Sequence, residues 1–141
     1  MSIVSSSDFQ GEITIGQLEH RDVKANLNLF IEKYEPEFLD MLLGENLAEK
    51  LKDGLAEVTP DAKWSTLADK VRLACANYIY FHYMRDDVTS STGAGEVIEQ
   101  TDNAKRTTPH MKLVRAWNEM VKKNIALDYW INKGEIGRAH V

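Results

Sequence analysis

The chain has 141 residues, which suits one domain that buries roughly two thirds of the surface of the unfolded chain. Its 43% hydrophobic and 28% charged residues are typical of a folded globular protein and exclude an intrinsically disordered one. The net charge of −5 excludes the broad basic surface of a primary nucleic-acid-binding protein.

The sequence also argues against a membrane or secreted protein. The longest apolar run, from Tyr78 to Met84, is too short for a bilayer, which needs about 20 apolar residues. Residues 1–11 are polar and serine-rich, so we expect neither a signal peptide nor a membrane partner. The single cysteine, Cys75, has no second cysteine to pair with, which indicates a reducing compartment.

The first part of the chain predicts an arm followed by short helices. Residues 1–18 lack a helical pattern and are expected to form a flexible or docking arm, in which residues 12–15 alternate like a short strand. Apolar residues then recur at helical spacing from Val23, and Pro36 is expected to end that helix and to open the next one, which stops at Gly44. A third short helix follows, over residues 47–55.

The fourth predicted helix, which ends near residue 87, carries the most informative stretch. Ten of the twelve residues from Leu73 to Met84 are apolar or aromatic, and at about 100° per residue they leave no polar face. A helix that is apolar all round is buried on all sides. We therefore expect either the central helix of a bundle or a helix that a second subunit covers, which makes Tyr80 and Tyr83 candidate contacts between subunits.

Residues 88–103 show no hydrophobic pattern. A loop of this length between well-patterned helices is commonly functional, so we expect it to contact a partner. The candidate contact residues in it are Thr89, Ser90, Ser91, Thr92, Gly93, Ala94, Gly95 and Glu96. Residues 96–99 have the composition of a short strand.

The last predicted helix begins at Thr108 and Pro109, an N-cap followed by a first-turn proline. Its buried row is expected at Leu113, Trp117, Met120, Leu127 and Ile131, with Asn124 as a polar member. Its basic side, either solvated or facing an acidic partner or DNA, consists of Lys112, Arg115, Lys122 and Lys123, together with His110. Trp130 lies near the helix end, where a partner could cover it, and is a further candidate contact.

The sequence thus predicts an all-α bundle of four to five helices, with a domain over residues 19–133 and a tail over residues 134–141.

No catalytic site has support in the sequence. Residues 92–95 lack the Gly-Lys-Ser/Thr ending and the preceding strand of a phosphate-binding loop. His82 and Asp86 have the spacing of two metal ligands, but a third is not recognisable. Burial would disfavour the thiolate of Cys75. We expect no catalytic residue, no cofactor and no metal, and a protein that is not an enzyme.

Four segments of the sequence resemble one protein family. They are YEPEFLDMLLG (34–44), ANYIYFHYMRDD (76–87), TSSTGAGE (89–96) and TPHMKLVRAWNEMV (108–121). These segments are similar to the small helical head–tail connector proteins, also called adaptor or head-completion proteins, of tailed bacteriophages and prophages, notably those of Bacteroidetes hosts. The resemblance spans residues 34–130.

This resemblance implies a helical bundle that docks beneath the portal protein as a ring of about twelve copies. The ring would extend the DNA channel, through which DNA passes without sequence-specific binding, and would offer a surface to the next tail or neck protein. Residues 89–96 would be a projecting loop, and residues 1–18 and 134–141 would be docking arms. The protein would belong to the virion, at the head–tail junction, and to the host cytoplasm before assembly.

Two other functions fit the same sequence. One is a homodimeric helical interaction module or another small virion protein, which differs from a connector in the size of its assembly and in the role of the long loop. The other is a DNA-binding protein that uses the last helix. The acidic total charge and the lack of an interleaved Arg/Lys cluster are unfavourable to that function.

Overall fold

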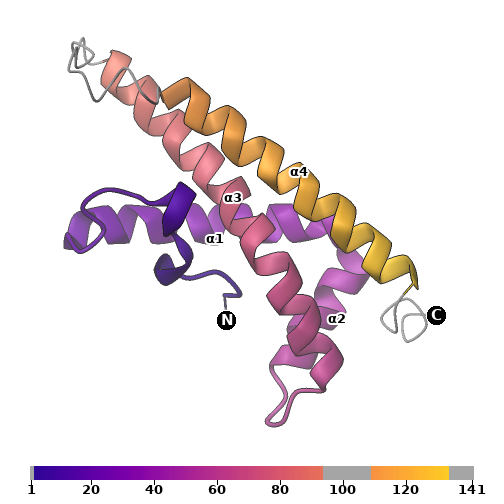
Figure 1. The fold of residues 1–141 in the computed structure, drawn as a ribbon. Helices are drawn as coiled ribbons and strands as arrows, with labels where there is room; N and C mark the ends of the chain where they lie inside the picture. The colour runs from indigo at the N-terminus through magenta and orange to yellow at the C-terminus, as the bar shows by residue number, and fades with distance from the viewer. Residues whose placement is uncertain (1, 94–108, 134–141) are drawn as a thin grey trace.

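The computed structural model of the protein describes residues 2–93 and 109–133, and all regular secondary structure in these ranges is helical (Figure 1). The predicted all-α fold class is confirmed. The bundle consists of α1 (Arg21–Leu43), α2 (Glu45–Leu55), α3 (Ala62–Gly93) and α4 (Pro109–Lys133). Two short 3-10 turns, η1 (Ser6–Asp8) and η2 (Gly11–Ile13), precede α1.

The helix α3 is the centre of the bundle. It lies antiparallel beside α4, α1 crosses it, and α2 packs near its first turns (Figure 1). Because three helices and η2 contact α3, its side chains are covered on several sides within a single chain. Leu67, Val71, Cys75 and Ile79 all have an exposed fraction of zero. The absence of a polar face on this helix is therefore explained by its central position.

The helix α1 is continuous through Pro36, so the predicted helix end before that residue is wrong. A proline inside a helix lacks one hydrogen bond and costs roughly 3 kcal/mol. Packing offsets this cost, because α1 is buried on both sides of the proline, at Ile31 and at Phe38. The helix ends before Gly44, as expected, where φ is +84° and a side chain would be strained.

Residues 2–15, which belong to the predicted arm, pack on the helices of their own chain. Four of their apolar side chains are buried in the core, namely Val4, Phe9, Ile13 and Ile15. The predicted strand at residues 12–15 does not form, and residues 11–13 instead make the turn η2, which Gly11 enters with a φ of +70°. A strand needs a neighbouring strand to satisfy its backbone groups, and the described residues contain none.

The helix α3 extends six residues beyond the predicted end, to Gly93. Thr89, Ser90, Ser91, Thr92 and Gly93 are therefore helical and do not form a loop. Their small side chains carry no apolar pattern, but adding residues to an existing helix is far easier than starting one. Three predicted features lie outside the described residues. They are the candidate contacts Ala94, Gly95 and Glu96, the strand at residues 96–99 and the tail at residues 134–141.

Candidate functional site

The helix α4 carries a second apolar row on its solvent side, which we name the outer stripe. Its members are between 38% and 67% exposed and are Met111, Val114, Trp117, Val121, Ile125 and Tyr129. At 100° per residue, these positions fall within a sector of about 120°. With a rise of about 1.5 Å per residue, the stripe is about 27 Å long. It is the most extensive exposed apolar feature among the residues that the structure describes.

The outer stripe adjoins the face of α4 that is buried against the bundle. The buried residues of that face are Ala116, Met120 and Leu127. Trp117, predicted in the buried row, lies at the boundary, where it is 39% exposed and its ring centroid is 4.9 Å from that of Phe81. Thus α4 is apolar over two adjacent faces, and its own chain covers one of them. Contiguous exposed apolar surface of this kind marks an interaction site.

A groove of about 780 Å³ lies beside the first half of the outer stripe. Met41 of α1, which is 64% exposed, and the aromatic rings of Tyr78, Phe81 and Trp117 line it. Tyr78 is fixed by a hydrogen bond of 2.6 Å from its hydroxyl to Glu37, and burial together with this bond raises the pKa of Tyr78. The groove therefore continues the apolar surface of the stripe towards α1.

His82 lies at the edge of this groove and is held by aromatic contacts. Its ring stacks on Tyr34 at 4.1 Å with an angle of 4° between the planes, and Nη2 of Arg85 lies 3.0 Å from its Nδ1. Burial and then the charge of Arg85 lower the pKa of His82, which favours the neutral ring. His82 and Asp86 have the spacing of two metal ligands, but no group of three His, Cys, Asp or Glu suited to a metal occurs in the described ranges.

The aromatic residues predicted to contact a neighbour lie elsewhere. Tyr80 is 1% exposed, in the core, where burial raises its pKa. Tyr83 is 9% exposed and packs edge-on against Phe30 at 5.2 Å. Trp130 is half-buried, with Nζ of Lys70 at 5.0 Å from its ring centroid. A single chain already covers these rings to a large extent, and the structure does not bring them together into one surface.

Three of the four cations on the basic side of α4 are paired with carboxylates of the chain, and two of these three share Glu119. Glu119 lies 3.1 Å from Nζ of Lys122 and 3.7 Å from Nζ of Lys123, and Lys122 in particular holds the pKa of that carboxyl below its usual range. Nε of Arg115 lies 3.5 Å from a carboxylate oxygen of Glu12. A cation that is paired with a carboxylate neutralises a phosphate less effectively, so these pairs lower the affinity of this side of α4 for DNA.

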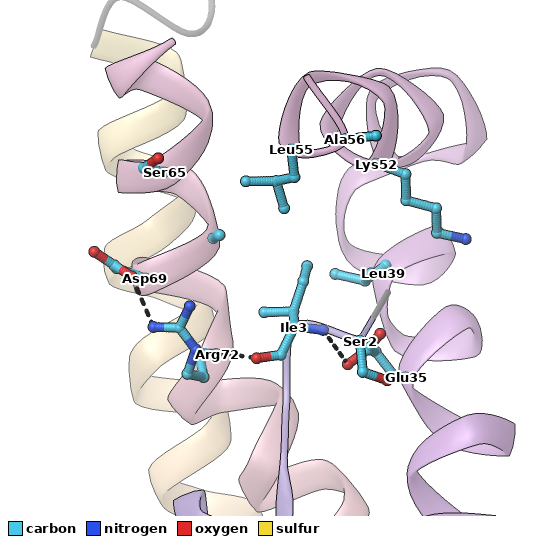
Figure 2. A pocket seen from close by; sticks show the side chains of 11 residues that line it. Ser2, Ile3, Glu35, Leu39, Lys52, Leu55, Ala56, Ser65, Asp69 and Arg72 are labelled. Carbon is cyan, nitrogen blue, oxygen red and sulfur yellow. Dashed lines mark hydrogen bonds and ion pairs between the residues drawn. The ribbon is translucent and has the colours of Figure 1, made fainter. Parts of the chain in front are cut away.

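A second cavity, of about 470 Å³, lies between α1, α2 and α3 (Figure 2). Ser2 and Ile3 run along it. Oε1 of Glu35 accepts the backbone N–H groups of Ile3 at 2.9 Å and of Val4 at 2.8 Å, and Nε of Arg72 donates to the carbonyl oxygen of Ile3 at 3.1 Å. We name Glu35 and Arg72 the clamp, because together they hold the backbone of this segment.

Each clamp residue is stabilised in turn. Nη1 of Arg72 lies 2.7 Å from a carboxylate oxygen of Asp69 (Figure 2). Glu35 is 6% exposed, and burial raises its pKa even though the two N–H donors and Lys52 act in the opposite direction. The clamp bonds reach only backbone atoms, so they would hold this stretch of chain whatever its side chains.

Comparison of the chain with protein-family models, with curated proteins and with solved structures finds no match. Among the described residues, no helix is both long and apolar enough to cross a membrane. The candidate functional features of the described residues are the outer stripe with its groove and the clamp with its cavity.

Proposed function

We propose that the protein is a structural virion protein, a subunit of the head–tail connector of a tailed bacteriophage that assembles as a ring beneath the portal. The outer stripe of α4 is the observation that carries this proposal. Six exposed apolar side chains in line on a folded domain are expected of a subunit whose surface is completed by a neighbour. The kind of assembly, a ring beneath the portal, is inferred from the resemblance of residues 34–130 to head–tail connector proteins.

The distribution of charge supports a contact between unlike surfaces. The helix α4 carries five Lys/Arg and two Asp/Glu residues, so it is net positive. The helices α1 and α2 together carry five Lys/Arg and eight Asp/Glu residues, so they are net negative. A ring requires two different patches that meet head to tail, and opposite net charges on different elements favour such a contact over one between identical faces. The outer stripe would supply one of these two patches.

In this proposal the protein acts through binding alone. Its partners are further copies of itself, the portal protein and the next tail or neck protein, and DNA passes through the channel of the ring. The paired cations of α4 suit such a channel protein, because tight binding of phosphates would retard DNA passage.

Electron microscopy of the protein mixed with the portal protein encoded beside its gene tests the proposal, with a portal-free sample as the control. A ring that caps the portal is the expected result. A folded protein that leaves the portal bare would contradict it.

One observation favours a second candidate, a helical homodimer that serves as an interaction module. Five positions of α4 follow alternating steps of three and four residues, which is the heptad spacing of a coiled coil, namely Met111, Val114, Asn118, Val121 and Ile125. In a coiled coil, one asparagine at such a position can specify the pairing. Sedimentation velocity separates the two candidates. A dimer that forms without the portal and does not bind it would favour the module, and rings that require the portal would favour the connector.

A further inference from the structure

Residues 2–15 are attached to the bundle in a way that a second copy could reproduce. Their apolar anchors, Val4, Phe9, Ile13 and Ile15, fill the core, and the clamp holds the backbone at residues 3 and 4. None of these contacts depends on the two parts belonging to the same chain. The segment of another copy would make the same hydrogen bonds and bury the same side chains.

The connection between this segment and α1, residues 16–20, is short and strained, and we name it the hinge. Gln17 has a φ of +58° and is the only residue other than glycine with a positive φ in the described ranges. That region is sparsely populated by residues with a side chain, and a strained hinge invites the exchange of an element between copies. Opening the hinge would let Gln17 adopt an ordinary backbone conformation.

The hinge also has sufficient reach. Residues 16–20 lie between the last buried anchor, Ile15, and the start of α1 at Arg21. Five extended residues span at most about 17 Å. An opened hinge could therefore carry the segment away from its own bundle and onto an adjoining one.

We propose that neighbouring copies exchange this segment, so that the clamp of one subunit holds residues 3 and 4 of the next. The partner is a second copy of this chain, and the inference rests on the proposed function for the ring in which the copies meet. Each subunit would give one segment and receive one, which is a head-to-tail link that can close a ring. The clamp lies apart from the outer stripe, so the exchange adds a second contact between the same neighbours.

Cross-linking between different chains tests the exchange. Ser2 and Ser65 line the same cavity, are exposed and lie outside the clamp, so Ser2→Cys and Ser65→Cys are mild changes. The two single variants are co-expressed with the portal protein, treated with a bismaleimide that spans the cavity, and compared with the double variant. The unchanged chain is the control, since its Cys75 is fully buried.

Exchange predicts covalent dimers from the mixture of single variants. Links that form only inside the double variant, or no link in either sample, would overturn it. Gln17→Gly supplies a second test, because glycine removes the strain of the closed hinge, and it should lower the share of links between chains about fivefold. Glu19→Gly loosens the same hinge without relieving a positive φ, so it should lower the share of links between chains by less. Equal effects of the two variants would count against the role of Gln17.

The same experiment separates this inference from the proposed function. Rings on the portal without links between chains would overturn the exchange and leave the connector standing. Linked copies that never cap the portal would support the exchange and contradict the connector.

Discussion

The backbone N–H of Val4 donates to Oε1 of Glu35 over 2.8 Å, and the same oxygen accepts the N–H of Ile3 over 2.9 Å. One carboxyl oxygen of α1 thus satisfies two N–H groups of the N-terminal segment. A buried donor without an acceptor costs about 1–3 kcal/mol. Glu35 is therefore important for the folded subunit itself, whichever copy supplies the segment.

Removing the acceptor should destabilise the protein, whereas keeping its oxygen should not. We expect Glu35→Ala to lower the free energy of unfolding by about 2 kcal/mol, because it leaves both N–H groups without their acceptor. Glu35→Gln keeps an Oε1 and should change it by less than about 1 kcal/mol. Urea denaturation of both variants measures the difference, and equal losses would show that the hydrogen bonds contribute little.

The ionisation of Glu35 predicts a pH dependence. Its pKa in the folded protein lies above the ordinary value of 4.5, so the folded state binds this proton more tightly than the unfolded state. The resulting stabilisation is complete below pH 4.5 and is lost as the pH rises through the pKa of the folded state. The stability of wild type relative to Glu35→Gln should therefore fall as the pH rises from 4.5.

This comparison isolates Glu35 from His82. The pKa of His82 is lowered, so its contribution to stability is lost as the pH falls below 6.5, in both proteins alike. Urea denaturation at a series of pH values checks the prediction. A stability difference that is constant over the series would contradict it.

Gly54 of α2 and the indole of Trp64 in α3 are in close contact. A Cβ at position 54 would overlap the five-membered ring of Trp64. Gly54→Ala should therefore lower stability by about 1–3 kcal/mol, although alanine is the better helix former. In a double-mutant cycle, Trp64→Leu should restore part of the loss, as measured by thermal unfolding. Without such coupling, the clash would not be the cause.

Asn124 has a buried Oδ1 for which the described residues provide no hydrogen-bond donor. Asn124→Leu removes this unsatisfied acceptor and keeps the branching of the side chain, and we expect it to raise the free energy of unfolding by about 1 kcal/mol. Asn118→Leu is the matched control, because Asn118 is exposed on the same helix and its replacement should stay within about 0.5 kcal/mol. A loss of stability in Asn124→Leu would show that the acceptor is satisfied by solvent.

Much of the fold could be predicted from local pattern. The helical spacing of apolar residues predicted the helices, and Gly44 predicted the boundary between α1 and α2. Local rules failed at Pro36, where packing of α1 on both sides outweighs the cost of the proline. They failed again at residues 89–93, because a long helix can extend through residues of low propensity.

The candidate surface was harder to predict than the fold. The spacing predicted that residues 73–84 of α3 are covered on all sides, and Leu73, which is 51% exposed, is an exception. The spacing did not show whether the chain itself or a neighbour covers Tyr80. The outer stripe was readable in the same spacing, as a second row from Val114 to Ile125 beside the buried one. Which of two adjacent apolar rows faces the bundle depends on the placement of α1 and α3. The clamp gave no sequence signal, because it joins residues 31 and 69 positions apart.

The outer stripe as the assembly surface is the central claim, and co-sedimentation with portal particles tests it most directly. Ile125 in the stripe and Leu29 on α1 are matched, with exposed fractions of 67% and 63%. Ile125→Glu should leave the monomer folded and abolish binding to the portal, whereas Leu29→Glu should bind like wild type. Binding of Ile125→Glu at the level of wild type would contradict the claim.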